Sequence, residues 1–428
     1  MHRVVITGLG CVTPIGSTVD TFRDALFAST TGIAPLHDIP GVIPITEPET
    51  LKLRFTQAGQ VKDFDAAAHL SSGVISASDR TAHFAIVAAR QAAHQAELTQ
   101  HHAAHRIAIV FGCSTGGRAS EEAEVGKLYT RDARMHPLSV VRTMANAGAS
   151  HVSIDLGITG PVLTLSTACA SGTHAIGLAF HMVRAGMVTA AIAGGHEAPL
   201  TFAFLRGWDS MRVVSPTRCR PFSADRDGMT LGEGAAMLTL GTLESAQARN
   251  APIFAEIVGF GMSADAAHIT NPAASGAGSA MQNALADVLN TPGDPTTLAQ
   301  TPAFQALLDE VGYINAHGTG TQANDSTEAA AIHQLFGSRA PHIPISSTKP
   351  LHGHSIGATG AIEALATVLA LHHGQLPATC GVTTVDPTLN LDIITGPSRP
   401  ATATLALSNS LAFGGINAVL ALRPFPAK

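Results

Sequence analysis

The sequence predicts an α/β fold made of two halves of similar layout, with parallel, helix-covered sheets. Short runs of β-branched and aliphatic residues recur along the chain, and many are followed by apolar residues at helical spacing. The same succession of strand, glycine turn, helix and strand restarts at Ala251-Pro252. A repeated α/β layout indicates an internal duplication, so we expect two domains, residues 1–250 and residues 251–428.

The elements of the first half follow from their residue patterns. Helices are expected at 18–27 and 79–96, and strands at 4–10, 107–111, 161–165, 190–198 and 235–240. Residues 31–78 are rich in Pro, Gly and Asp, which predicts surface loops with short helices. The turn Gly8-Leu9-Gly10 lacks the third glycine of a dinucleotide fingerprint, because Thr13 holds that position and Pro14 follows. We interpret it as a structural turn.

The second half repeats these elements. Strands are expected at 254–263, 311–316, 343–348 and 404–409, and helices at 277–289 and 358–371. The helix at 358–371 is apolar and rich in glycine and alanine, so we expect it to be buried. Residues 291–301 hold three prolines and a glycine, which predicts a surface excursion.

Composition excludes several classes of function. The net charge of −6 and the lack of a sustained basic run disfavour a nucleic-acid surface. No apolar run reaches the length of a membrane span, and the first residues are too short an apolar stretch for a signal peptide. Five cysteines without CxxC spacing disfavour a disulfide framework and a zinc site. His101, His102 and His105 cluster, but no carboxylate or cysteine completes a metal site. We expect a cytoplasmic enzyme.

Cys169 stands where a predicted strand turns into a predicted helix. Residues 161–165 read as a short buried strand, and apolar residues recur at helical spacing from Ala175 to Val183. A thiol near the positive end of a helix dipole has a lowered pKa and a larger thiolate fraction. The small neighbours of Cys169 leave room for a substrate. This stretch alone supports a nucleophile and a buried structural cysteine about equally.

Three polar runs in the second half each follow a predicted strand. They contain His317, Lys349, His354 and the turn Phe413-Gly414-Gly415. Ligands of α/β folds bind at the carboxyl ends of strands, and the backbone N–H groups of a glycine turn suit an oxyanion. One histidine at such a place is more often structural. Two of them, with a lysine and a cysteine at a helix tip, predict an active site.

Four motifs, in this order, make the chain resemble the β-ketoacyl-acyl-carrier-protein synthases, thiolase-like condensing enzymes. They are Thr167-Ala168-Cys169-Ala170-Ser171-Gly172, His317-Gly318-Thr319-Gly320-Thr321, Lys349 with His354 five residues on, and Phe413-Gly414-Gly415. The resemblance extends from Val4 to about Leu422 and is strongest to the type II elongating synthases. It implies a thiolase-like fold, in which the duplicated halves form an α-β-α-β-α layered architecture.

The resemblance also implies catalytic roles. Cys169 would take the acyl group from an acyl carrier protein as a thioester, and the backbone N–H groups of Cys169 and Phe413 would form the oxyanion hole. His317 and His354 would assist the decarboxylation of malonyl-carrier protein and stabilise the enolate that attacks the thioester. Lys349, paired with Glu328, would order the site. The first half would thus carry the nucleophile and the second half its partners.

Further positions are implied to bind the substrate. Thr319 and Thr321 would hydrogen-bond the pantetheine arm, and Phe413 would gate the acyl pocket. The remaining pocket positions are Thr115, Leu138, Ser139, Phe202, Gly414 and Gly415. Leu411-Ala412-Phe413 stands where Phe-Gly-Phe is usual, and Thr115 stands where a larger apolar residue is common. These departures hint at a roomier acyl tunnel, as in synthases of specialised polyene or polyketide chains.

The implied enzyme is an acyltransferase of fatty acid or specialised chain elongation. It needs no cofactor or metal, because its substrates arrive on the phosphopantetheine arm of the carrier. Its expected partners are an acyl carrier protein and a second subunit, either a copy of itself or a chain-length-factor-like homologue. A thiolase acting on coenzyme A thioesters is the rival, but it would need a second catalytic cysteine, and no cysteine follows Cys380.

Overall fold

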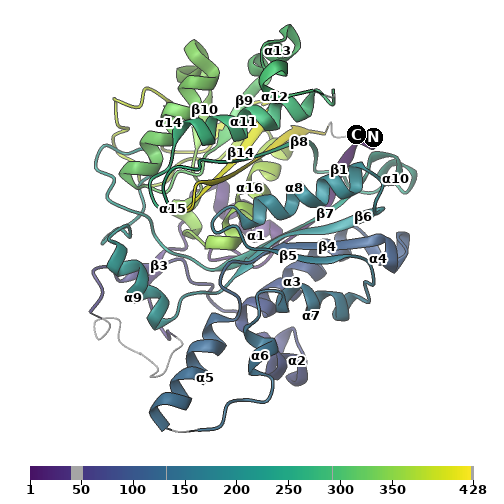
Figure 1. The fold of residues 1–428 in the computed structure, drawn as a ribbon, viewed down its shortest axis with the longest axis vertical. Coiled ribbons are helices and arrows are strands. Elements are labelled where there is room, and N and C mark those ends of the chain that lie inside the picture. Colours follow the sequence, from purple (N-terminus) through teal and green to yellow (C-terminus); the bar gives the residue numbers. More distant parts are fainter. Residues whose placement is uncertain (40–51, 132, 292, 426–428) are drawn as a thin grey trace.

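The computed structural model describes residues 1–39, 52–131, 133–291 and 293–425 (Figure 1). In this part of the chain the core is a mixed sheet of 11 strands, in the order β12-β10-β9-β14-β15-β8-β1-β7-β6-β4-β5. The strands of the first half are β1 (Val4–Val12), β4 (Ile107–Gly112), β5 (Val162–Leu165), β6 (Ala190–Glu197) and β7 (Gly234–Thr242). Those of the second half are β8 (Ala255–Ala264), β9 (Val311–Asn315), β10 (Pro344–Ser346), β12 (Asp392–Ile393), β14 (Leu405–Ala412) and β15 (Ile416–Pro424).

The two halves of the sheet have the same strand order. The first half reads β1-β7-β6-β4-β5 and the second half reads β8-β15-β14-β9-β10, and the halves meet where β1 pairs with β8. The internal duplication expected from the sequence is therefore visible in the topology. The division proposed at residue 250 falls between α10 (Leu243–Ala248) and β8.

The expectation of parallel sheets is wrong for part of each half. Strands β4, β5 and β6 run parallel, as do β9, β10 and β14. In contrast, β7 pairs antiparallel with β1 and β6, and β15 pairs antiparallel with β8 and β14. The reason is visible at β14 and β15, which only the three residues 413–415 connect. A parallel crossover needs a much longer connection.

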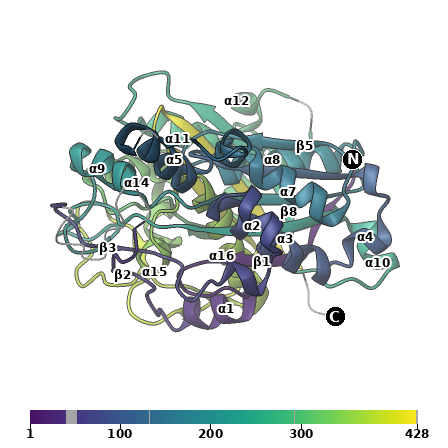
Figure 2. The same cartoon turned by 90° about the horizontal axis from the view of Figure 1, so that it is seen from below.

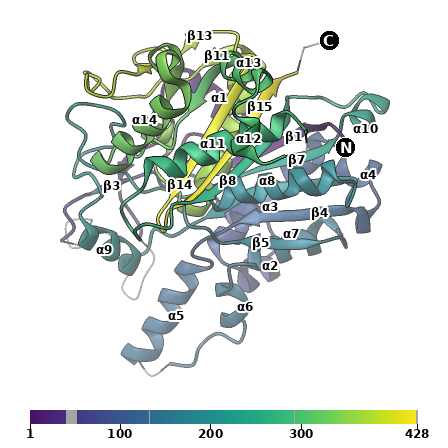
Figure 3. The ribbon, with the colours of Figure 1, turned by 45° about the horizontal axis from the view of Figure 1, so that its top comes forward.

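Helices separate and cover the halves of the sheet, which gives the expected five layers (Figures 1 and 3). On the outside of the first half, α3 (Arg80–Gln95) and α7 (Ala147–Leu156) lie side by side (Figure 2). The middle layer holds α8 (Ser171–Arg184) and α16 (Thr359–His373), which contact each other and strands of both halves. The outer layer of the second half consists of α11 (Ala274–Val288), α13 (Pro302–Glu310) and α14 (Gln322–Phe336).

The remaining elements lie mostly at the periphery, except α15, whose four residues are buried. The helices are α1 (Val19–Phe27), α2 (Ser72–Ala77), α4 (Leu98–His101), α5 (Arg118–Arg131), α6 (Ser139–Thr143), α9 (Phe202–Met211), α12 (Pro295–Leu298) and α15 (Lys349–His352). Small strands are β2 (Ala34–Pro35), β3 (Gln57–Ala58), β11 (Gln375–Leu376) and β13 (Arg399–Pro400). Residues 40–51 of the predicted loop region lie outside the described residues. Among the residues described, no helix has the length and apolar character needed to cross a membrane.

Small residues allow the middle helices to approach their neighbours closely. A Cβ on Gly112 would lie 2.3 Å from the backbone of Ser171, and one on Gly172 would lie 2.8 Å from the backbone of Ala361. Gly112 lets the start of α8 pack directly on the end of β4, and Gly172 lets α8 pack closely against α16. Since α16 is buried from Thr359 to Leu371, as predicted, the start of α8 is fixed inside the molecule.

Candidate active site

Cys169 lies in a tight corner between β5 and α8. The preceding Ala168 has a φ of +48°, in the left-handed region that non-glycine residues rarely adopt. Its carbonyl oxygen accepts hydrogen bonds from Ser114 Oγ at 2.9 Å and from Ser171 Oγ at 2.7 Å. Strained backbone persists where its surroundings hold it, commonly at functional sites. The predicted strand-to-helix corner is confirmed, with Cys169 just before the helix. The expectation of a buried strand is wrong, because β5 is an edge strand that contains no buried residue.

The thiol of Cys169 is buried, and burial is the largest influence on its pKa. Its side chain is 5 % exposed, and Sγ lies 3.1 Å from Nε2 of His354. Burial raises the pKa of the Cys169 thiol to about 11, although the charge of Lys349 and the backbone N–H groups of Phe413 and Cys169 act to lower it. The lowered pKa expected from the helix end is therefore wrong for the free enzyme, because loss of hydration exceeds the favourable interactions.

This burial predicts how the alkylation of Cys169 depends on pH. Because the thiolate is the nucleophile and the pKa is raised to about 11, the alkylation rate should rise roughly tenfold per pH unit between about pH 7 and pH 10. Iodoacetamide labelling followed by mass spectrometry of the Cys169 peptide measures this rate. A plateau below about pH 8 would contradict the raised pKa.

His354 and His317 both present a neutral Nε2–H donor to the site. Nδ1 of His354 accepts a hydrogen bond from the Ile356 N–H at 3.3 Å, so its proton is assigned to Nε2. Nδ1 of His317 lies 3.3 Å from Nζ of Lys349, a group that can only donate. Burial and the charge of Lys349 hold the pKa of both imidazoles well below their usual range. Both rings are therefore uncharged hydrogen-bond donors at neutral pH.

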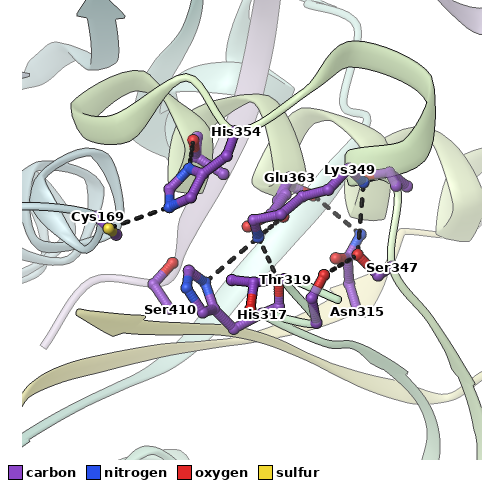
Figure 4. A network of polar contacts seen from close by, with 12 residues as sticks. Cys169, Asn315, His317, Thr319, Ser347, Lys349, His354, Glu363 and Ser410 are labelled. Carbon is purple, nitrogen blue, oxygen red and sulfur yellow. Dashed lines mark hydrogen bonds and ion pairs between the residues drawn. The ribbon is translucent and has the colours of Figure 1, made fainter. Parts of the chain in front are cut away.

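Lys349 is paired with Glu363, and the predicted pairing with Glu328 is wrong. Nζ of Lys349 lies 2.5 Å from Oε1 of Glu363, both side chains are fully buried, and the ammonium also donates to the carbonyl oxygen of His317 (Figure 4). The partner comes from α16, where Glu363 is a lone acid among apolar residues. An isolated carboxylate in a helix expected to be buried was the sequence signal for this ion pair, since buried charges need partners.

Glu328 instead holds the loop that carries His317. Its carboxylate accepts hydrogen bonds from the N–H of His317 at 2.8 Å, the N–H of Gly318 at 2.9 Å and Nδ2 of Asn409 at 3.1 Å. These bonds connect α14, the loop that follows β9 and the middle of β14. Glu328 thus binds the backbone N–H of His317, whereas Lys349 contacts both its ring and its carbonyl oxygen.

A narrow cavity of about 100 Å³ leads to these groups. Predicted residues that line it are Cys169, His317, Thr319, Thr321, His354, Phe413, Gly414 and Gly415. Residues 268–272 form part of the wall and were not predicted. Ligand pockets of drug-sized molecules are usually about 300–1,000 Å³, so this cavity is small by comparison. The structure thus brings together residues from both halves of the chain.

Four predicted pocket residues do not line this cavity. Oγ1 of Thr115 donates to Glu197 at 2.6 Å, and Oγ of Ser139 donates to the carbonyl oxygen of His136 at 2.6 Å. Leu138 and Phe202 are 40 % and 37 % exposed. Their roles as acyl-pocket residues stay predictions.

The convergence of a thiol and two imidazoles also raises the question of a metal. Ligand atoms of Cys169, His317 and His354 all lie within 4.8 Å of one another, and no other such group was found in the part of the chain that the structure describes. The ammonium of Lys349, 3.3 Å from Nδ1 of His317, opposes a further positive charge there. The arrangement therefore fits acyl and proton chemistry better than metal binding.

The comparisons with known proteins agree with this geometry. Family models described as "Beta-ketoacyl synthase, N-terminal domain" and "Beta-ketoacyl synthase, C-terminal domain" match residues 1–246 and 254–383. A 3-oxoacyl-[acyl-carrier-protein] synthase 2 of Staphylococcus aureus is 40 % identical over 434 residues, covering 99 % of both chains.

Solved structures match over the whole chain as well. The ishigamide ketosynthase/chain length factor has a TM-score of 0.88 at 31 % identity, covering 99 % of this chain and 100 % of that one. A type II polyketide synthase acyl-carrier protein in complex with its ketosynthase contains a chain with a TM-score of 0.84 at 28 % identity, with coverage of 99 % and 100 %. This chain belongs to the β-ketoacyl synthase family and is a condensing acyltransferase of the 3-oxoacyl-acyl-carrier-protein synthase type.

Proposed function

We propose that Cys169 carries an acyl chain while malonyl-carrier protein is decarboxylated beside it. In the first step the sulfur of Cys169 attacks the acyl carbonyl of acyl-carrier protein. A thioester forms on Cys169, and the thiol proton leaves with the thiol of the carrier. The backbone N–H groups of Cys169 and Phe413, which both act to lower the pKa of the thiol, would stabilise the oxyanion.

In the second step the malonyl group loses carbon dioxide, and the electron pair of the broken bond forms an enolate. The Nε2–H donors of His317 and His354 stabilise the enolate oxygen, and its carbon attacks the Cys169 thioester. The 3-oxoacyl chain stays on the carrier, and the sulfur of Cys169 leaves as a thiolate that takes up one proton from solvent, which restores the thiol. Because decarboxylation supplies the electron pair, the reaction needs neither a base to remove a carbon-bound proton nor a redox cofactor or metal.

The observation that carries this proposal is the pair of neutral imidazole donors beside the thiol. A thiolase must remove a proton from its substrate, whereas two uncharged donors suit an enolate that already exists. The turn Phe413-Gly414-Gly415 offers no second cysteine at the cavity. Thr319 and Thr321, whose hydroxyls lie 2.9 Å apart in the wall, would hydrogen-bond the pantetheine arm of the carrier.

Intact-mass spectrometry with a panel of acyl-carrier thioesters tests the proposal. The panel should include short, long, saturated and polyunsaturated chains, because the departures at Thr115 and Ala412 favour an unusual chain. We expect a mass increase of one acyl group, located on the Cys169 peptide, and a 3-oxoacyl product once malonyl-carrier protein is added. Failure of every thioester to acylate Cys169 would overturn the proposal.

A second ketosynthase-type chain is the further partner that we propose. Strand β5 is an edge of the main sheet, and exposed apolar residues lie on β5, on the helices α7, α6 and α5, and on the loop before α6. Helix α7 contacts β5, α6 contacts α7, and α5 contacts α6. The exposed apolar residues include Tyr129, Leu138, Val140, Met144, Ile154 and Leu163. Such a patch beside an unpaired edge strand suits an interface with another chain. The related ketosynthase/chain length factor structure supports a partner of this kind.

Native mass spectrometry of the protein expressed alone separates the two forms of this assembly. A species of twice the 43.9 kDa chain mass identifies a homodimer. A monomer that pairs only when a chain-length-factor-like homologue is co-expressed identifies a heterodimer. A monomer under both conditions would refute the interface. The cytoplasmic location stays a prediction.

A further inference from the structure

The only tryptophan of the chain stacks on the proposed gate residue. Trp208 lies on α9, and its ring is 5.8 Å from the ring of Phe413 with an interplanar angle of 19°. Offset stacking of aromatic rings at this separation is attractive beyond the area that it buries. The contact joins a helix of the first half to the turn between β14 and β15 in the second half.

Trp208 is held on the side away from Phe413. Its ring lies 5.9 Å from that of Phe204, and it packs against a buried cluster that contains Phe204 and Leu205. The next residue, Asp209, accepts hydrogen bonds from the N–H of Arg54 at 3.2 Å and from its Nε at 3.0 Å. The Trp208 ring is thus the anchored member of the stacked pair.

Phe413 begins the glycine turn that connects β14 to β15. Gly414 and Gly415 have φ angles of +86° and +68°, which glycine adopts without strain. The same Phe413 lines the cavity together with Cys169, and its backbone N–H acts to lower the pKa of the Cys169 thiol. A movement of Phe413 therefore changes access to the nucleophile and the position of a proposed oxyanion donor together.

We propose that Trp208 is a positioning residue that clamps Phe413 in a closed position, and that this stack opens when an acyl chain enters. The inference rests on the proposed acylation of Cys169 and adds the residue that controls access to it. Closing the turn again on Trp208 would return the N–H of Phe413 to the sulfur. Trp208 itself touches neither substrate nor sulfur in this arrangement.

The fluorescence of Trp208 provides a direct test. Because Trp208 is the only tryptophan, excitation at about 295 nm reports this ring alone. Acylation of Cys169 is expected to shift the emission, since the ring loses its Phe413 neighbour. Phe413→Leu should give the shifted spectrum before any acylation. Complete acylation by intact mass without a change in emission would overturn the clamp, whereas absence of acylation would overturn the proposed function instead.

Acylation kinetics test the same proposal independently of fluorescence. Trp208→Ala removes the stack and is expected to raise the rate of Cys169 acylation by about threefold to tenfold, the range that an aromatic pair supports. Trp208→Phe keeps a ring and should restore the wild-type rate. An unchanged or slower rate in Trp208→Ala would contradict the proposal.

Leu205→Val is the matched control for loosening of α9. Leu205 is buried in the same cluster but is not in the stacked pair. This variant should lower the melting temperature without changing the acylation rate. If it accelerated acylation as much as Trp208→Ala does, general loosening of the helix would explain the effect and the clamp would be refuted.

Discussion

Replacing Cys169 with alanine is expected to abolish condensation while leaving malonyl decarboxylation in place. Removal of a covalent nucleophile costs at least about 10⁴-fold in other enzymes, because no other group in the cavity can form the thioester. The Nε2–H donors of His317 and His354, which the proposed decarboxylation uses, remain. Product mass measures condensation, and carbon dioxide release from malonyl-carrier protein measures decarboxylation.

Two further variants complete this test. His317→Ala should give the reverse pattern, with Cys169 still acylated and decarboxylation reduced by about 10²- to 10⁴-fold, the usual contribution of such a group. Cys380→Ala is the matched control, because that half-buried cysteine lies outside the cavity, and its thiol donates to the carbonyl oxygen of Ser29 at 3.6 Å. Condensation by Cys169→Ala at a rate near that of Cys380→Ala would refute the nucleophile.

Lys349→Met should reduce both stability and decarboxylation. The substitution leaves the fully buried carboxylate of Glu363 without its cation, and breaking a buried pair in this way costs about 3–5 kcal/mol. It also removes the donor that keeps the proton of His317 on Nε2. Urea unfolding measures the first effect, and carbon dioxide release from malonyl-carrier protein measures the second.

The stability deficit of Lys349→Met should depend on pH in a defined direction. Burial already raises the pKa of Glu363 to about 7 in the presence of Lys349, and removing the lysine raises it further. A carboxyl group with a raised folded-state pKa binds its proton more tightly in the folded than in the unfolded protein. Proton binding therefore stabilises the folded state at low pH, and this stabilisation is lost as the pH rises through the folded-state pKa. The deficit relative to wild type should therefore be smaller at about pH 5 than at about pH 8.

The double variant Lys349→Met/Glu363→Gln separates two effects on stability, the unpaired charge of Glu363 and the altered packing at residue 349. Without the carboxylate there is no uncompensated charge, so this variant should recover part of the lost stability and lose the pH dependence. It should not recover decarboxylation, since His317 still lacks its donor. A double variant no more stable than Lys349→Met would contradict the buried ion pair.

The sequence by itself determined the parts that depend on neighbouring residues. The strand-to-helix corner at Cys169, the buried helix at 358–371 and the restart at Ala251 are local patterns of period and small residues, and the structure has each of them. The polar runs at His317, His354 and Phe413 were recognisable because each follows a predicted strand. Such features depend on the backbone preferences of neighbouring residues, and these preferences can be recognised from the sequence of the segment itself.

Only the tertiary structure decided what depends on contacts between distant segments. Glu363 rather than Glu328 faces Lys349 because α16 passes behind the site, and no spacing along the chain reveals that. Strand β7 pairs antiparallel with β1 and β6, and the spacing of the strands along the chain does not reveal this pairing. The three-residue connection from β14, in contrast, already favours an antiparallel β15. The thiol pKa rose to about 11 because desolvation depends on everything packed around Cys169, whereas the helix end that predicted the opposite is a local effect.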